Sequence, residues 1–198
     1  MGKVKSEKVL AKLNTAGGHV FVIGDAGKLD QYFAEIAADE RGKAGIEQLG
    51  RGKTGIKPFT HGSFTGAVCS FFPASEIMLV QGENGLHLVP AQVDAWKVSV
   101  AMPSILDVIH APVPEKPTGT VPLEIPSGVI GVARVFPASK TAPPVLSDEE
   151  KAKVGRGGLS GLRLLLVEAP GNYTMTYERL NRGEEWGTIS GRVAFRAG

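Results

Sequence analysis

The sequence is poor in residues that cross-link a chain or chelate a metal. Cys69 is the only cysteine among 198 residues, so no disulfide forms within the chain and a cysteine zinc site is excluded. The four histidines are His19, His61, His87 and His110. None has a histidine partner at the i+2 or i+4 spacing that chelation from one element requires. We therefore expect no metal and no cofactor.

Long hydrophobic runs and an excess of one charge are also missing. The apolar runs are far shorter than the roughly 18 residues of a membrane helix, and no apolar run follows the basic start as in a signal peptide. The 22 basic and 20 acidic residues leave a net charge of +2, too small to attract nucleic acid or a membrane surface. We expect a cytoplasmic protein with no membrane span and no nucleic-acid partner.

Glycine and proline, in contrast, are abundant. The 26 glycines and 13 prolines make up about a fifth of the chain, against an average of roughly 12%. Such a turn-rich chain favours many short strands over long helices. A chain of this length also buries roughly 70% of its unfolded surface, so the composition predicts a mainly β protein, of α+β type, with a substantial core.

One segment occurs twice. Residues 54–75, TGIKPFTHGSFTGAVCSFFPAS, return 64 positions later as residues 118–139, TGTVPLEIPSGVIGVARVFPAS. Nine of the 22 positions are identical: Thr54/Thr118, Gly55/Gly119, Pro58/Pro122, Ser63/Ser127, Val68/Val132, Phe72/Phe136, Pro73/Pro137, Ala74/Ala138 and Ser75/Ser139. We interpret this self-match as an internally duplicated β unit.

The duplication suggests an organisation for the whole chain. The first repeat occupies residues 52–111, and the second, with its linker PVPEKP, occupies residues 112–198. A unit of this size buries little surface alone, so the two are expected to pack as one pseudo-twofold sandwich or barrel, which also closes strand edges. Residues 1–51 precede them as an N-terminal α/β extension with a basic glycine-rich loop.

Local patterns add detail to this fold. The apolar spacing in residues 1–13 predicts a basic helical arm, and HVFVI at 19–23 predicts a buried strand. Asp25 is expected to cap a helix that carries the apolar stripe of residues 29–40. Asn84-Gly85, between two apolar runs, predicts a β-hairpin.

Two patterns resemble a catalytic pair and a phosphate-binding loop, but neither is complete. His61 and Ser63 would share a face in a strand, yet the second copy has Ile125 in place of His61 and keeps Ser127 in place of Ser63. The shared serine is therefore expected to be a turn or capping residue of the repeated unit and not a nucleophile. Residues 50–54, GRGKT, resemble the end of a phosphate loop, but the first glycine of that motif falls on Glu47.

The loop of residues 41–57 is the main concentration of positive charge. Its five basic residues stand against the single acid Glu47, a local net charge of +4, and its glycines leave backbone amides accessible to an anion. We predict that it docks an acidic surface or a phosphate group; the alternative is a solubilising loop without a partner. The predicted partner-binding residues are Arg41, Lys43, Arg51, Lys53, Lys57 and His61.

Three short segments, TAGGHVFVIGD, IPSGVIGVARVF and APGNYTMTYE, resemble small β-rich bacterial immunity proteins of polymorphic toxin systems. The resemblance implies a non-catalytic protein that binds and blocks another protein. Two alternatives remain open. One is a self-assembling subunit of shell or capsid type, hence a homo-oligomer. The other is an enzyme or small-ligand binder with a site between the two repeats, where His61, His87 and His110 would be the titratable groups.

Overall fold

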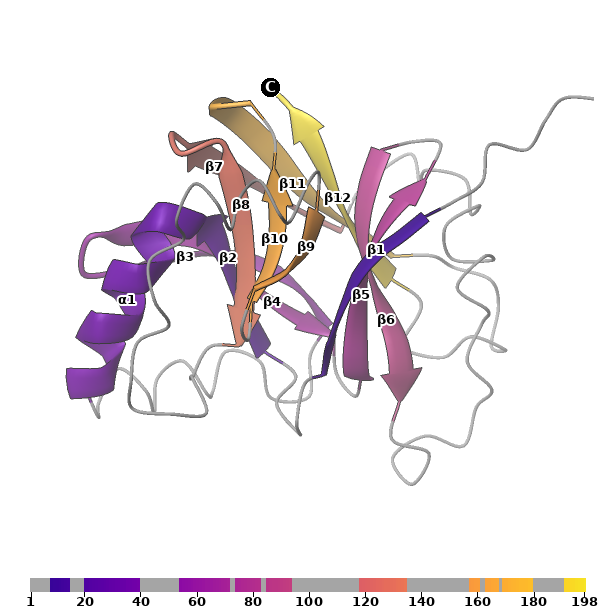
Figure 1. Ribbon diagram of the computed structural model, residues 1–198, viewed down its shortest axis with the longest axis horizontal. Coiled ribbons are helices and arrows are strands. Elements are labelled where there is room, and N and C mark those ends of the chain that lie inside the picture. The colour runs from indigo at the N-terminus through magenta and orange to yellow at the C-terminus, as the bar shows by residue number, and fades with distance from the viewer. Residues whose placement is uncertain are drawn as a thin grey trace, which may run out of the picture.

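The chain folds into two antiparallel β-sheets and one helix. A computed structural model describes residues 8–14, 20–39, 54–71, 74–82, 85–93, 118–134, 157–160, 163–167, 169–179 and 191–198. These residues form twelve strands and one helix, arranged as two six-stranded sheets (Figure 1). The prediction of a mainly β protein is therefore confirmed.

The first sheet has the order β1-β5-β6-β12-β11-β7, and every neighbouring pair is antiparallel. Its strands are β1 (Lys8–Asn14), β5 (Ala74–Gly82), β6 (Gly85–Val93), β7 (Gly119–Ile125), β11 (Gly171–Arg179) and β12 (Gly191–Ala197). The predicted hairpin is present, because β5 and β6 pair along their length down to Gly82 opposite Gly85.

The second sheet has the order β3-β4-β2-β8-β10-β9 and is also antiparallel throughout. Its strands are β2 (Val20–Asp25), β3 (Thr54–His61), β4 (Phe64–Phe71), β8 (Val129–Arg134), β9 (Gly157–Ser160) and β10 (Arg163–Val167). Strand β2, predicted as a buried strand, lies between β4 and β8 near the centre of this sheet.

The main core lies between the two sheets. Alternate residues of the strands whose side chains are described point inward, and they form one continuous apolar cluster. Leu79, Leu88 and Met175 belong to it from the first sheet, and Phe21 and Ile130 from the second. The strands thus alternate between a core-facing and an outward-facing set, which decides where polar residues can lie.

The sheets approach each other at both edges without joining. Strand β3 lies against β7 and β1 against β9, but neither pair forms a ladder among the described strands, so the described part of the chain is a sandwich and not a closed barrel. Two of these edge strands carry an exposed proline, Pro58 in β3 and Pro122 in β7. Proline cannot donate to a ladder, and it protects a strand edge against further pairing.

The structure does not show the predicted duplication. In the first copy β3 and β4 form a hairpin within one sheet, joined by the two-residue turn Gly62-Ser63. In the second copy β7 belongs to the first sheet and β8 to the second. Pro58 and Pro122 instead lie in two edge strands, and Ser63 and Ser127 lie in turns. The proposed boundaries at residues 51 and 111 stay predictions.

The N-terminal helical arm is wrong for residues 8–13. This stretch is part of β1, which pairs with β5, with Leu13 buried in the core and Lys12 exposed. Short apolar patterns fit a helix and a strand alike, and here the edge of β5 supplies backbone partners that an isolated short helix lacks.

The predicted helix is α1 (Ala26–Ala38), and it covers the outer face of the second sheet, away from β5 and β6 (Figure 1). Its buried Leu29, Tyr32, Phe33 and Ile36 form a second apolar cluster with residues of β2, β3, β4 and β8. It ends at Ala38. Strands β2, β4 and β8 are therefore covered on both faces, by the core on one side and by α1 on the other.

Asp25 caps α1 as predicted and also ties it to a distant turn. Its Oδ1 accepts from the amides of Gly27 (2.9 Å) and Lys28 (3.2 Å). Its Oδ2 accepts from the amide of Ser127 at 2.8 Å, and the residue is only 2% exposed. One carboxylate thus fixes the start of the helix against the β7–β8 turn.

We expect Asp25→Ala to lower the free energy of unfolding by about 2 kcal/mol, because a helix cap and a hydrogen bond to a charged acceptor are lost together. Asp25→Asn keeps one acceptor oxygen for the helix amides and should cost about half as much. Urea unfolding of both variants measures this. Equal stability of Asp25→Ala and wild type would show that the carboxylate does not hold the turn.

Candidate functional site

The outward face of the first sheet carries buried polar residues. Along β11 the residues Tyr173, Met175 and Tyr177 enter the core, so Thr176 and Glu178 face outward. Both are nevertheless buried, at 4% and 1% exposure. Polar side chains that are shielded from water need hydrogen-bond or charged partners within the protein. The outward face of the first sheet is therefore the strongest candidate for a site.

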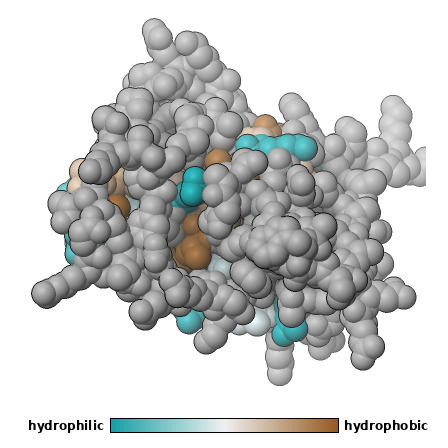
Figure 2. All heavy atoms as spheres, turned by 90° about the horizontal axis from the view of Figure 1, so that it is seen from below, coloured by the Kyte–Doolittle hydropathy of each residue, from teal (hydrophilic) through white to brown (hydrophobic). Residues whose placement is uncertain are grey.

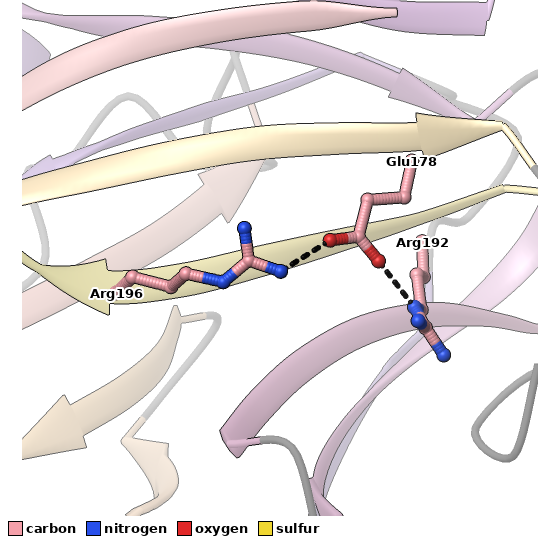
Figure 3. A network of polar contacts seen from close by, with 3 residues as sticks. All are labelled: Glu178, Arg192 and Arg196. Carbon is pink, nitrogen blue, oxygen red and sulfur yellow. Dashed lines mark hydrogen bonds and ion pairs between the residues drawn. The ribbon is translucent and has the colours of Figure 1, made fainter. Parts of the chain in front are cut away.

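Three charged side chains form a network on this face. The Glu178 carboxylate lies between two guanidinium groups (Figure 3). Its Oε2 accepts from Arg192 Nε at 2.6 Å and its Oε1 from Arg196 Nη2 at 2.7 Å. The side chains of Glu178 and Arg192 are 1% and 0% exposed, whereas that of Arg196 is 43% exposed. The network therefore runs from the interior to the surface.

His87 lies on the neighbouring strand β6, on the same face. It is 1% exposed, and neither ring nitrogen has a hydrogen-bond partner among the described residues. Burial and then the charge of Arg192 lower the pKa of His87 from 6.5 to about 4, with Glu178 opposing and Arg196 adding to the shift. The imidazole is therefore neutral at pH 7.

This gives a pH-dependent stability. The unfolded chain binds a proton at His87 near pH 6.5 and the folded chain only near pH 4. The stability that the neutral, buried His87 contributes is therefore fully present above pH 6.5 and is lost as the pH falls toward 4. The loss amounts to about 3 kcal/mol. In His87→Phe we expect this part of the acid destabilisation to disappear. Denaturant unfolding of both proteins at pH 7.5 and pH 4 tests it; parallel curves would contradict the assignment.

Only two of the six predicted partner-binding residues, Lys57 and His61, lie in the part of the chain that the structure describes. Arg41, Lys43, Arg51 and Lys53 lie outside the described residues. Lys57 is exposed on β3. Their docking role stays a prediction.

His61, the sixth predicted contact residue, is half-buried at the end of β3. Its ring stacks on Phe59 with 6.5 Å between centroids and meets Tyr32 edge-on at 5.8 Å. Its Nε2 is 4.0 Å from Asp39. The Ser63 hydroxyl donates to Glu35 at 3.2 Å, which gives this serine a structural partner on α1.

The described residues do not bring the predicted histidines together. His61 packs beside α1 on the outer face of the second sheet, and His87 lies on the outer face of the first, with the apolar core between them. His110 lies outside the described residues. The described space between the sheets is thus filled by apolar side chains rather than by a polar cleft.

Cys69 is also in the core, and burial raises the pKa of its thiol, so the reactive thiolate form is suppressed. Among the described residues, no group of His, Cys, Asp and Glu is arranged to hold a metal ion. No described helix is long and apolar enough to cross a membrane.

An open groove lies at one end of the sandwich. It has a volume of about 340 Å³ and is lined by Lys28 of α1, Thr65 of β4, Pro122, Leu123 and Glu124 of β7, and Asn172 of β11. Seen from below, the described residues are visible only as small separate patches, and no broad hydrophobic patch of described residues appears on that face (Figure 2).

Sequence reasoning missed Glu178, Arg192 and Arg196. The alternation in residues 173–178, YTMTYE, does place the threonines and Glu178 on the non-core face. It gives no sign that this face is buried, because alternation normally marks a solvated face. No protein-family model, curated protein or solved structure matches this chain.

Proposed function

We propose that this protein is a non-catalytic binding module that docks on another protein and blocks it, in the manner of the immunity proteins that its sequence resembles. The observation that carries this proposal is the open groove between α1, β4 and β7. Its lining includes the apolar residues Pro122 and Leu123, exposed polar side chains at Thr65 and Asn172, and one charge of each sign. Such a lining suits an extended segment of a partner protein.

The position of the groove supports the same proposal. It is bordered by the edge strand β7, whose exposed Pro122 disfavours open-ended strand addition. A partner is therefore held by side chains at a defined place and not by extension of the sheet. A rim with Lys28 and Glu124 also orients a partner segment through its own charges.

The test begins with a tagged copy of the protein and affinity capture from cells of its source. Captured proteins are identified by mass spectrometry, purified, and mixed with the untagged protein. Isothermal titration should give a defined stoichiometry, and the partner's own activity should fall as the complex forms. No reproducible partner, with light scattering showing a homo-oligomer, would favour the self-assembling subunit instead.

Charge reversal locates the surface. Glu124→Lys and Lys28→Glu should each weaken the complex at least roughly ten-fold, since rim charges in contact with a partner act on both orientation and encounter. Lys12→Glu, at the other edge of the first sheet, is the matched control and should leave the affinity unchanged. Equal effects of all three would place the interface elsewhere.

The basic loop is tested separately. Arg51→Ala with Lys53→Ala should weaken the complex more at low salt than at physiological salt, where exposed charges are screened within about 8–10 Å. Unchanged affinity at low salt would remove the loop from the interface and leave the groove as the contact surface.

A further inference from the structure

The open groove at the end of the sandwich is lined from both sheets. Lys28 of α1 and Thr65 of β4 line it on the side of the second sheet. Glu124 of β7 and Asn172 of β11 line it on the side of the first sheet. These elements meet because β7 lies against β2, β3 and β4 of the other sheet. A ligand in this groove therefore contacts both sheets at once.

The polar side chains that line the groove are available to a ligand. Lys28 is half-buried, whereas Thr65, Glu124 and Asn172 are exposed. In the part of the chain that the structure describes, none of these four side chains takes part in a hydrogen bond or an ion pair. The Lys28 ammonium and the Glu124 carboxylate thus line the same groove without pairing with each other. Each can take an opposite charge from a ligand.

Asp25 holds the backbones of the two charged residues in a fixed relation. Its buried carboxylate accepts from the amide of Lys28 at 3.2 Å and from the amide of Ser127 at 2.8 Å. Ser127 is three residues after Glu124, in the turn that follows β7. The start of α1, with Lys28, is thereby tied to the end of β7, with Glu124. A groove that is organised before binding loses less entropy when a ligand is bound.

We propose that the groove binds an extended segment of a partner protein with one acidic side chain, placed at Lys28, and one basic side chain, placed at Glu124. This inference rests on the proposed function, because it names the partner segment of the same groove. A segment with charges of one sign would attract one of the two groove charges and repel the other, so the groove discriminates against it. The Thr65 hydroxyl and the Asn172 amide bind backbone groups of the segment, and the exposed Pro122 contacts an apolar side chain.

Synthetic peptides test this charge selection without the natural partner. Capped peptides of equal length carry Asp and Lys, two Asp, two Lys, or Asn and Gln at two variable positions, with Val and Gly elsewhere. Each is made with one and with three residues between the variable positions, which keeps both side chains on one face of an extended chain. Binding is measured at low ionic strength from the NMR signals of the Asn172 side-chain amide, which are assigned from their absence in Asn172→Ser.

We expect the wild-type protein to bind the Asp and Lys peptide roughly five-fold more tightly than either like-charged peptide, because each of those exchanges an attraction for a repulsion. The neutral peptide should also bind more weakly. The Asp and Lys peptide has no net charge, so its preference cannot come from the net charge of the protein, and it should fade at high salt. Equal binding of the four peptides, or binding of none, would overturn the proposal.

Single charge reversals should switch the preferred peptide. Lys28→Glu makes both groove charges negative, and its tightest peptide should become the one with two Lys. Glu124→Lys makes both positive, and its tightest peptide should become the one with two Asp. Lys12→Glu, at the other edge of the first sheet, is the matched control and should keep the wild-type order. Groove variants that keep the wild-type order, or a control that switches with them, would overturn the proposal.

The result is separable from the test of the proposed function. Suppose that a captured partner binds more weakly to Glu124→Lys while the four peptides bind alike. The binding module then stands and the mixed-charge segment is wrong. If both groove variants switch their preferred peptide but no partner activity is blocked, the groove still selects mixed-charge segments, and the blocking role is the part that fails.

Discussion

Replacing Glu178 by Gln should lower the free energy of unfolding by about 4 kcal/mol, within the 3–5 kcal/mol typical of breaking a buried ion pair. The side chain keeps its volume, so no cavity contributes. What changes is the charge: Arg192, with 0% exposure, keeps its positive charge and loses the carboxylate 2.6 Å away. Urea unfolding at pH 7 measures the effect.

Two further variants separate charge from packing. The double change Glu178→Leu with Arg192→Met removes both buried charges and should recover most of the loss, because a buried pair replaced by apolar residues is often neutral. Arg196→Met removes only the 43% exposed partner and should cost less than about 1 kcal/mol. If the double variant were as unstable as Glu178→Gln, lost packing and not the broken ion pair would be the cause.

Replacing Phe64 by Ala should also cost about 4 kcal/mol, the range found for large-to-small changes of a buried aromatic residue. Phe64 is 0% exposed, and its ring lies 5.2 Å from that of Tyr32 and 6.2 Å from that of Phe59. It fills space left by two glycines, since a Cβ added at Gly24 or Gly66 would come within 2.7 Å of it. The change therefore loosens α1 from the second sheet.

Phe64→Leu is the matched control and should cost only about 1 kcal/mol, because most of the volume is kept. Thermal and urea unfolding of both variants give the comparison, and the near-ultraviolet circular dichroism of Tyr32 and its neighbours reports on the aromatic cluster. A Phe64→Ala variant as stable as Phe64→Leu would show that the ring does not hold the helix in place.

Several elements were readable from the sequence because their signals are local. The cap at Asp25 and the helical stripe from Leu29 to Ile36 both lie within one segment, and α1 forms there. The strand HVFVI and the hairpin around Gly85 depend in the same way on apolar runs and turn chemistry. The mainly β class followed from the glycine and proline content.

The pairing of strands was not readable. The same T-G-x-x-P…Ser pattern leads to a hairpin within one sheet at residues 54–71 and to a crossing between sheets at residues 118–134. The helical spacing of residues 8–13 gave way to a strand against β5. Register and partner choice depend on surfaces far apart in the chain, which a local pattern does not specify.

The candidate site, like the fold, was predictable from the sequence only in its local features. The sequence by itself determined that Thr176 and Glu178 face away from the core, because side chains alternate along a strand. Only the tertiary structure decided that this face is buried and that Arg192, Arg196 and His87 meet there from two other strands. Strand alternation is a property of neighbouring residues, whereas burial and charge pairing depend on which distant strands lie side by side.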